Sequence, residues 1–507
     1  MRITNNMIIN KTTSNMNSNR LNVDKLNTQM STQKKIQKPS EDPVIAIRAL
    51  RLRTSLSQVT QYYEKNIPDA NSWLDTTETA LTNMQKLLND IRTQCVNGTT
   101  DTLTADDRNT ILTNLKALQE QVYSEGNADY AGRTVFTGYR TNCKLVFDDA
   151  DEASTISYDI TESISASKIE THTYITDGVT VPSTAAEITD TTALEKAYSN
   201  SSDYERVRLA YGNVTSDPTI TFSDASITAA NYTIYDTLQD WEDASATAGT
   251  ENAFSLGDDD MVFIKETGEL VLGKNLASSI KSADATIDVD YNKTGFNVGE
   301  LRPEFYFNCT DVTDSVNPVS YVNFDNGARI YQDISYTIAT GQELVINTQA
   351  ADVFNSDIYQ DVKELTSIVQ RAITANENVA KIKEMLNNSV YADYTDELNE
   401  WLETATREKD LADEAMQETY SSYITRFDNY LNNVNLELTK IGTKGDRLDM
   451  TETRVGNQQS TLEKLKSENE DEDLSEIIIN YTAAYVAYQA CLQAASKVEK
   501  QSLLDYL

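Results

Sequence analysis

Few residues in the chain could carry acid–base or metal chemistry. Its single histidine, His172, lies in the segment ETHTY (170–174). A general base must reach the proton that it removes and be oriented by a neighbour, and a lone histidine among threonines offers neither, so we interpret His172 as a surface or turn residue. The acidic triplet at 258–260 lacks the alternating spacing and distant glutamate of a calcium loop, and we expect a solvated turn there.

Other signatures of catalysis or cofactor binding are also missing. The sequence contains no glycine-rich phosphate loop and no GxSxG or HExxH motif. Its four cysteines, at 95, 143, 309 and 491, stand singly, which is typical of neither a disulfide framework nor a metal site. Cys95 and Cys491 fall on apolar helical stripes, where we expect them to pack as small hydrophobic side chains. We therefore predict that the protein is not an enzyme and has no catalytic residue, no cofactor and no metal.

The chain is acidic, and its charge is unevenly distributed. The formal net charge of the 507 residues is −36, with +4 in residues 1–147, −25 in 148–348 and −15 in 349–507. This balance argues against nucleic acid or an anionic membrane as a partner. The first 53 residues hold ten basic side chains against three acidic ones, so a basic amino-terminal helix facing an acidic carboxy-terminal segment is electrostatically favourable.

The sequence carries no sign of a targeting or membrane segment. The start, MRITNNMIINKTTSNMN, lacks the apolar run of a secretory signal peptide, and no stretch approaches the roughly 18 apolar residues of a membrane-spanning helix. With 39% hydrophobic and 24% charged residues, the composition is that of a folded chain.

The stretch KIQKPSEDPV (35–44) contains two prolines four residues apart. Each proline disfavours the helical region for the residue before it, and an aspartate followed by proline is a favourable start for a helix. We predict a short, stiff joint that ends one helix and caps the next. This interhelical joint comprises Pro39, Ser40, Glu41, Asp42 and Pro43. The alternative is an ordinary interhelical turn.

Apolar residues recur with a helical period towards both ends of the chain. A period of about 3.5 residues over several heptads predicts helices packed along one another as a coiled coil or bundle. Thr104-Ala-Asp-Asp107 resembles a capping box that starts one of these helices. The amino-terminal stripes contain Ile9, Met16, Val23, Leu26 and Met30, then Leu52, Leu56, Val59 and Tyr63, then Leu74, Thr77, Leu81, Met84, Leu88, Ile91 and Cys95. The carboxy-terminal stripes contain Leu431, Val434, Leu438, Ile441, Leu448, Val455 and Leu462, then Leu474, Ile477, Tyr481, Ala484, Tyr488, Cys491, Ala495 and Val498.

The middle of the chain, from about 141 to 350, has a different pattern. Short runs such as TITF (219–222), MVFI (261–264) and ELVIN (343–347) are typical of strands, and Gly-containing turns separate them. The sequence therefore predicts an α+β fold, in which amino- and carboxy-terminal helices pack as an elongated stem and a β-rich, acidic, solvent-facing domain is inserted between them.

One face of the last helix is rich in tyrosine, a side chain that packs while its hydroxyl stays in water. This face could belong to the core of the chain itself, or it could be a subunit-packing or chaperone-docking face, for which a single amphipathic helix is a typical target. The residues of this candidate face are Ile478, Tyr481, Tyr485, Tyr488, Leu492, Leu503 and Leu504.

Five segments of the chain resemble the flagellin superfamily, and within it the family of hook–filament junction proteins. They are MRITNNM at the start, KIQKPSEDPVIAIRA at the joint, NSWLDTTETALTNM (71–84), TVFTGYRT (134–141) and AYVAYQACLQAASKVEKQSLLDYL (484–507). The resemblance covers about 1–147 and 331–507, including DISYTIATGQELVINTQAADVF (333–354). Flagellin itself is the nearest rival, but it typically carries an Asp-Asp-Ala-Ala-Gly segment where this chain has EDPVI (41–45).

The resemblance implies a structural protein of the bacterial flagellum that acts as a junction adaptor between hook and filament, on which flagellin assembles. It implies terminal helices at 1–38 and 473–507 that form an inner coiled coil, a helical stem at 39–147 and 350–472, and a β-rich outer domain at 148–349. It implies assembly with copies of itself, with another hook-associated protein on the hook side and with flagellin on the filament side. It also implies an extracellular location, export through the flagellar type III apparatus without a cleaved signal peptide, and a cytoplasmic export chaperone that holds about 474–507.

Two other functions stay open at this point. A flagellin-type filament subunit would be able to extend filaments without help. An adhesin or glycan-active enzyme displayed by the acidic middle domain would bind or cleave glycans through residues 148–348.

Overall fold

The computed structural model describes residues 5–100, 103–175, 178–196, 201–248, 256–325 and 327–500. The chain divides into two compact units. We call the first, which comprises Met1–Asn71, Tyr336–Leu344 and Gly445–Leu507, the terminal unit, and the second, which comprises Ser72–Ser335 and Val345–Lys444, the central unit. Helices α3 (Ile67–Gly98) and α12 (Thr395–Glu470) contribute residues to both units.

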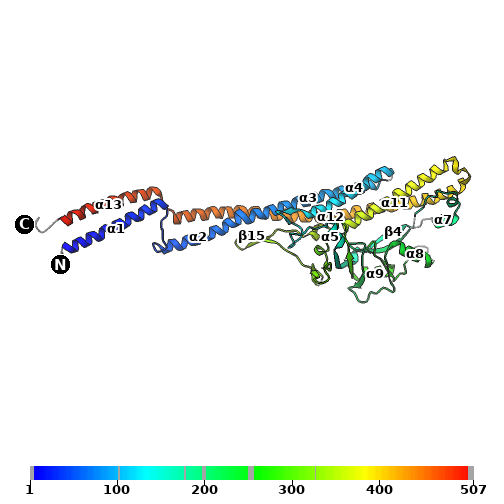
Figure 1. Ribbon diagram of the computed structural model, residues 1–507, viewed down its shortest axis with the longest axis horizontal. Coiled ribbons are helices and arrows are strands. Elements are labelled where there is room, and N and C mark those ends of the chain that lie inside the picture. The colour runs from blue at the N-terminus through cyan, green and yellow to red at the C-terminus, as the bar shows by residue number, and fades with distance from the viewer. Residues whose placement is uncertain are drawn as a thin grey trace, which may run out of the picture. The chain divides into compact units, whose positions relative to one another are not determined.

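The terminal unit contains an antiparallel pair of helices, α1 (Asn5–Thr32) and α13 (Leu474–Lys500). The two helices run side by side (Figure 1). Lys34, just after α1, forms an antiparallel bridge with Asp471, just before α13. Residues nearer the chain ends also meet, because Asn19 Nδ2 donates to Cys491 Sγ at 2.9 Å.

The rest of the terminal unit is built around the end of α12. Helix α2 (Pro43–Gln61) continues through one π-helical turn, η1 (Tyr62–Asn66), into α3. Gln459 of α12 donates to the Thr60 hydroxyl of α2 at 3.2 Å. Strands β15 (Ser335–Ala339) and β16 (Gln342–Val345) form a hairpin whose turn uses the left-handed φ of +69° at Gly341.

Helices α3, α4 (Ala105–Ser124), α11 (Asp357–Leu386) and the first part of α12 form the helical part of the central unit. The α3 residues of the predicted stripe, from Leu74 to Cys95, are all buried. Helix α4 begins with the predicted capping box, in which Thr104 and Asp107 bond to each other's backbone N–H. The Tyr123 hydroxyl of α4 donates to the Asn355 carbonyl just before α11 at 3.0 Å.

Two five-stranded sheets form most of the remainder of the central unit. The first has the order β12-β11-β3-β10-β6, and all its neighbouring strands are antiparallel. The second has the order β4-β5-β9-β8-β7, in which β7 and β8 are parallel and the other neighbours are antiparallel. The strands of the first sheet are β3 (Ser157–Ser165), β6 (Thr219–Phe222), β10 (Thr286–Thr294), β11 (Asn308–Asp311) and β12 (Val319–Tyr321). Those of the second are β4 (Glu170–Ile175), β5 (Ser201–Arg208), β7 (Tyr232–Tyr235), β8 (Met261–Ile264) and β9 (Glu269–Leu272).

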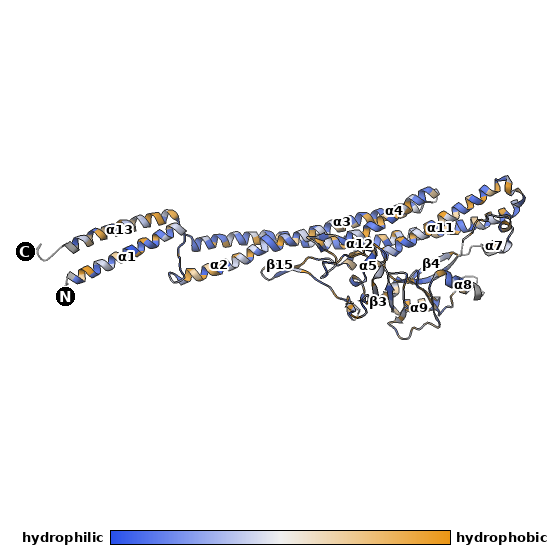
Figure 2. Ribbon diagram, viewed as in Figure 1, coloured by the Kyte–Doolittle hydropathy of each residue, from blue (hydrophilic) through white to orange (hydrophobic). Residues whose placement is uncertain are grey.

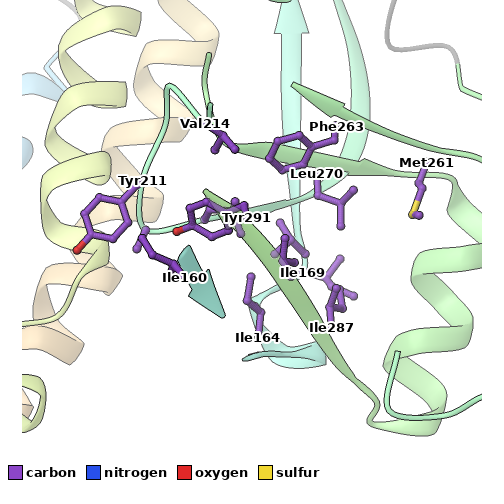
Figure 3. Packing of buried hydrophobic residues seen from close by; sticks show 14 of the residues in the cluster. Ile160, Ile164, Ile169, Tyr211, Val214, Met261, Phe263, Leu270, Ile287 and Tyr291 are labelled. Atoms are coloured by element: carbon purple, nitrogen blue, oxygen red, sulfur yellow. The ribbon is translucent and has the colours of Figure 1, made fainter. Parts of the chain in front are cut away.

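An apolar core fills the space between these sheets (Figure 3). Strand β3 alternates buried and exposed residues, so Ile160, Glu162 and Ile164 point inwards while the hydroxyl side chains of Thr161 and Ser163 face solvent. Strand β8 is buried on both faces: Phe263 enters this core, and Val262 packs on the opposite side with Trp241 of α8 (Leu238–Ala248). Helix α9 (Lys274–Ala283) closes the core through residues such as Ile280.

Short elements complete the central unit. The helices are α5 (Ala150–Thr155), α6 (Ala185–Ile188), α7 (Thr191–Lys196), α10 (Ala350–Val353), η2 (Glu125–Asn127), η3 (Ala166–Lys168), η4 (Pro303–Phe305) and η5 (Ser389–Tyr394). The strands are β1 (Asp129–Tyr130), β2 (Arg133–Thr134), β13 (Phe324–Asp325) and β14 (Ala328–Arg329).

The predicted α+β fold, with helical terminal regions and an inserted β-rich region, is confirmed. The runs TITF and MVFI are β6 and β8, and the run ELVIN begins in β16 but continues two residues beyond its end at Val345. The acidic triplet at 258–260 lies in an exposed turn, also as predicted.

Candidate assembly surface

Two connecting segments lie side by side in the terminal unit. One joins α1 to α2 and the other joins α12 to α13, and we call them the crossings. The backbone N–H of Lys35 donates to the Glu470 carbonyl at 2.8 Å. The bridge between Lys34 and Asp471 joins the same two segments. The start of α13 is therefore fixed against the segment that leads into α2.

Charged side chains strengthen this contact between the crossings. The Glu470 carboxylate, which is only 4% exposed, accepts from Arg53 Nε at 2.7 Å and from Arg53 Nη2 at 2.6 Å. Lys34 Nζ lies 3.6 Å from the same carboxylate and also donates to Asp471. The hydrogen bonds from Arg53 hold the pKa of Glu470 below its usual value, and the bond from Lys34 does the same for Asp471. We call Lys34, Arg53, Glu470 and Asp471 the crossing cluster.

The proline-rich joint caps α2 but does not end α1. The Asp42 side chain accepts hydrogen bonds from the two backbone N–H groups that follow Pro43, so its prediction as the N-cap is confirmed. Helix α1, however, already ends at Thr32, and Gln33 takes a left-handed φ of +56°. The prediction that the prolines end the first helix was therefore wrong, because a left-handed residue stops the helix before the prolines are reached.

Contacts between α1 and α13 follow a heptad stripe on each helix. The half-buried or buried residues alternate by three and four positions, as the sequence predicts for a coiled coil. On α1 they are Thr12, Met16, Asn19, Val23, Leu26 and the adjacent Gln29 and Met30. On α13 they are Ile477, Tyr481, Ala484, Tyr488, Cys491 and Ala495. Ile9, predicted to belong to this stripe, is exposed instead.

The other faces of the two helices carry many exposed apolar side chains. Leu21 of α1 is 69% exposed and Ile479 of α13 is 68% exposed. Figure 2 shows hydrophobic residues distributed along both helices. A concentration of exposed apolar residues on one part of a protein marks an interaction site. The exposed set comprises Met7, Ile8, Ile9 and Leu21 on α1 and Leu474, Ile478, Ile479, Tyr485, Val486 and Leu492 on α13. We call it the exposed apolar set.

The predicted tyrosine-rich face of α13 lies partly in the contact with α1 and partly on the exposed side of the helix. Tyr481 and Tyr488 are half-buried against α1, whereas Ile478, Tyr485 and Leu492 are exposed. The rings of Tyr481 and Tyr485 stack with centroids 5.9 Å apart. Leu503 and Leu504, which were predicted to belong to the same face, lie outside the described residues. A role of this face in subunit packing or chaperone binding stays a prediction.

The interpretation of His172 as a surface or turn residue was wrong. His172 lies in strand β4, and its Nε2 is 3.3 Å from Glu364 Oε1 of helix α11. Its ring also packs edge-on against Tyr204. Burial holds the pKa of His172 below its usual value. Sequence reasoning missed this because β4 packs against a helix that lies far from it in the sequence.

The crossing cluster was not singled out from the sequence either. Its only signal was the basic excess in the first 53 residues, which face acidic residues near the carboxy-terminus, as Arg53 and Glu470 do here. All four cysteines are free thiols, and Cys95 is buried in the helical core as predicted. Within the described residues, no helix is long and apolar enough to span a membrane and no cluster of side chains is suited to hold a metal ion.

Comparison with protein families finds two matches, one at each end of the chain. Residues 3–141 match the bacterial flagellin N-terminal helical region, and residues 424–507 match the bacterial flagellin C-terminal helical region. The first match includes α1, α2, α3 and α4, and the second includes α13 and the end of α12. The paired helices of the terminal unit thus belong to regions shared with flagellins.

Two characterised relatives carry the same name. The chain is 30% identical over 151 residues to flagellar hook-associated protein 3 of Salmonella typhimurium, an alignment that covers 30% of this chain and 47% of that protein. It is 30% identical over 118 residues to flagellar hook-associated protein 3 of Escherichia coli, covering 23% of this chain and 37% of that protein. The chain thus aligns with about half of the length of these relatives or less.

Solved structures of similar proteins align over most of the chain but superpose poorly. The flagellar junction protein FlgL from Legionella pneumophila is 10% identical, with 83% of this chain and 99% of that chain covered and a TM-score of 0.29. FlgL from Xanthomonas campestris is 9% identical, with 81% and 99% covered and a TM-score of 0.23. These values are too low to support an assignment, which rests on the sequence matches at the two ends. On those matches, the chain carries the bacterial flagellin N-terminal and C-terminal helical regions, and it is similar over part of its length to flagellar hook-associated protein 3.

Proposed function

We propose that the protein is a junction subunit of the bacterial flagellum, an adaptor between hook and filament on which flagellin assembles. The observation that carries the proposal is the exposed apolar set on α1 and α13. Two helices that expose residues such as Leu21 and Ile479 can bury them by packing against neighbouring subunits. The exposed set lies in the regions that match the bacterial flagellin N-terminal and C-terminal helical regions.

The joint and the crossing cluster support the same proposal. An adaptor has to hold its terminal helices at a defined offset from the helices that follow them. Here Asp42 caps α2, and Arg53 ties α2 to Glu470 at the end of α12. We propose that Pro39, Ser40, Glu41, Asp42 and Pro43 set the offset between the inner helix pair and the surrounding helices of the assembly.

The proposed partners follow from this role. They are copies of the chain itself, another hook-associated protein on the hook side, flagellin on the filament side, and a cytoplasmic export chaperone that binds α13 before export. The proposed location is the extracellular flagellum, reached by export without a cleaved signal peptide. No catalytic function and no nucleic-acid partner are part of the proposal.

Immunogold electron microscopy of isolated flagella tests the role directly. The antibody is raised against residues 148–348, and flagella from a strain lacking the gene are the control. We expect one narrow band where hook meets filament. Label along the whole filament would instead identify a flagellin-type filament subunit, and absence of label from intact flagella would contradict both roles.

A further inference from the structure

The central unit contains a cavity of about 490 Å³ that the proposed junction role does not use. Strands β4, β5 and β9 of the second sheet line one side, and helices α11 and α12 line the other. Figure 1 shows β4 beside α11. The volume lies within the range of small-molecule sites, which also occur preferentially where two parts of a fold meet.

Four arginines line the cavity, and three of them, Arg206, Arg208 and Arg426, are paired with carboxylates. Arg206 Nη2 donates to both Glu364 oxygens, at 2.5 and 2.7 Å, and Arg208 Nη1 donates to Glu364 at 2.7 Å. Arg426 Nη1 donates to Asp361 at 2.8 Å and pairs with Glu170. Arg206 also bonds to Glu170 and Glu269, and Arg208 to Asp361.

A charged ligand is disfavoured by this arrangement. An anion would compete with Glu364 for the guanidinium groups, and a cation would compete with those groups for the carboxylates. Breaking a buried pair leaves an uncompensated charge, which is strongly unfavourable. A neutral ligand, by contrast, can add hydrogen bonds to the free lone pairs of the carboxylates without separating any pair.

The cavity also presents hydroxyl groups that lack partners. The Tyr423 side chain is 2% exposed, and its hydroxyl has no hydrogen-bond partner among the described residues. The same is true of the buried Thr267 hydroxyl on the opposite side. Buried polar groups are normally hydrogen-bonded, so these two hydroxyls have hydrogen-bonding capacity that a molecule in the cavity can use.

Aromatic and aliphatic side chains line the rest of the cavity. Tyr174 and Tyr204 contribute rings, and Ile175, Leu238 and Ile368 contribute apolar surface. Paired carboxylates and guanidinium groups, free hydroxyls and tyrosine rings together suit a molecule with many hydroxyl groups and an apolar C–H face. We propose that this cavity binds a neutral polyhydroxylated molecule of the size of a mono- or disaccharide.

Saturation-transfer NMR on the full chain tests the ligand class. The neutral probes are glucose, galactose, N-acetylglucosamine and maltose, and the charged analogues are glucuronate and glucosamine. We expect saturation transfer from at least one neutral sugar. If that sugar is glucose, we expect its charged analogues to bind at least tenfold more weakly than glucose itself. Absence of a response from all four neutral sugars would show that the cavity holds only water and would overturn the proposal, as would stronger binding of glucuronate or glucosamine than of any neutral sugar.

Two variants locate the binding by calorimetry. Tyr423→Phe removes only the unpartnered hydroxyl, and we expect a loss of affinity of about 3–10-fold, the effect of one hydrogen bond. Ala415→Leu places extra side-chain volume in the cavity and should abolish binding. Tyr331→Phe, at an exposed position outside the cavity, is the matched control. Unchanged affinity in the Tyr423→Phe variant would place the sugar elsewhere and overturn the proposal, even if the Ala415→Leu variant fails to fold.

Discussion

The core of the two sheets buries its leucine side chains, whereas the α1–α13 pair leaves some of its leucine side chains exposed. Leu270 of β9 is 1% exposed inside the sheet core, whereas Leu492 of α13 is 40% exposed on the helix pair. The sheet core is closed by its own strands and by α9, so it derives its stability from within the chain. Two helices alone cannot surround an apolar stripe. The pair therefore keeps apolar surface available to neighbours, at the expense of its own stability.

The two leucines give the sharpest test of this difference. We expect Leu270→Ala to lower the free energy of unfolding by about 2–5 kcal/mol, because it leaves a cavity in a closed core. Leu492→Ala should change it by less than about 0.5 kcal/mol in the isolated chain. Urea denaturation of both variants, followed by fluorescence and circular dichroism, measures the difference. Equal losses would mean that the helix pair is as well packed as the core.

A buried carboxyl group makes the stability of the sheet core depend on pH. Glu162 of β3 accepts hydrogen bonds from the Tyr291 hydroxyl and from the Ala210 N–H at 3.2 Å. Burial raises the pKa of Glu162 to about 7. The folded state thus retains a proton that the unfolded chain releases near pH 4.3, so this stabilising contribution is complete below about pH 4 and is lost as the pH rises through 7.

We expect this linkage to lower the stability of the central unit by roughly 3 kcal/mol between pH 4 and pH 8. Glu162→Gln, which cannot ionise, should remove the dependence. Thermal unfolding of both proteins across this pH range measures it, with Glu205→Gln, at a charged site outside the core, as the control. A Glu162→Gln variant with the same pH profile as the wild type would contradict the assignment.

The crossing cluster should respond to pH in the opposite direction. Because the folded pKa values of Glu470 and Asp471 are depressed, their contribution is present above about pH 4 and is lost as the pH falls further. We expect Glu470→Gln to destabilise the terminal unit by about 1–2 kcal/mol at neutral pH, since it breaks a charge-assisted bidentate pair. Hydrogen exchange of α2 and α13 measures the effect, and Glu468→Gln, two residues earlier, is the control. Unchanged exchange rates would show that the backbone bonds alone hold the crossings.

Replacing the two prolines should affect assembly more than stability. We expect Pro39→Ala with Pro43→Ala to change the free energy of unfolding by no more than about 1 kcal/mol, acting through the unfolded chain. Incorporation into flagella should nevertheless fall while export continues. Immunoblots of isolated flagella and of the culture medium measure both, with Pro318→Ala, in an exposed loop, as the control. The proposal for the joint fails if mutant and wild type are incorporated equally.

The smallest effect on the isolated chain is expected from the exposed side of α13. Tyr485→Ala with Leu492→Ala should leave folding unchanged but weaken binding of the export chaperone by about tenfold or more, because exposed aromatic and aliphatic anchors carry most of such binding energy. Calorimetry with the purified chaperone measures this, and Thr482→Ala on the same helix is the control. Equal affinities would exclude this face as the docking site.

Local signals made much of the fold predictable from the sequence. The stripe from Leu74 to Cys95, the capping box at Thr104 and the N-cap at Asp42 depend on residues within a few positions of one another. Such patterns are visible because helix packing and capping repeat every three or four residues. The end of α1 was missed because Gln33 adopts a left-handed conformation. A glycine at this position would have indicated such a conformation, whereas a glutamine does not.

The parts that escaped prediction all depend on residues far apart in the chain. Arg53 meets Glu470 across 417 positions, and Arg206 meets Glu364 across 158. The sequence alone does not show whether a charged side chain is hydrated by water or pairs with a buried guanidinium group. For the same reason His172 was placed at the surface, although its strand packs against helix α11.

The pairing of α1 with α13 makes the order of folding depend on the completion of the chain. Asn19 and Cys491 are separated by 472 positions. Contacts of such long sequence separation form late, because a large loop must close before they contribute any stability. Residues 5–32 therefore lack their helical partner until residues 474–500 have been made and released. The amino-terminal segment stays without this partner during that interval, so closure of the helix pair reports that residues 474–500 are available.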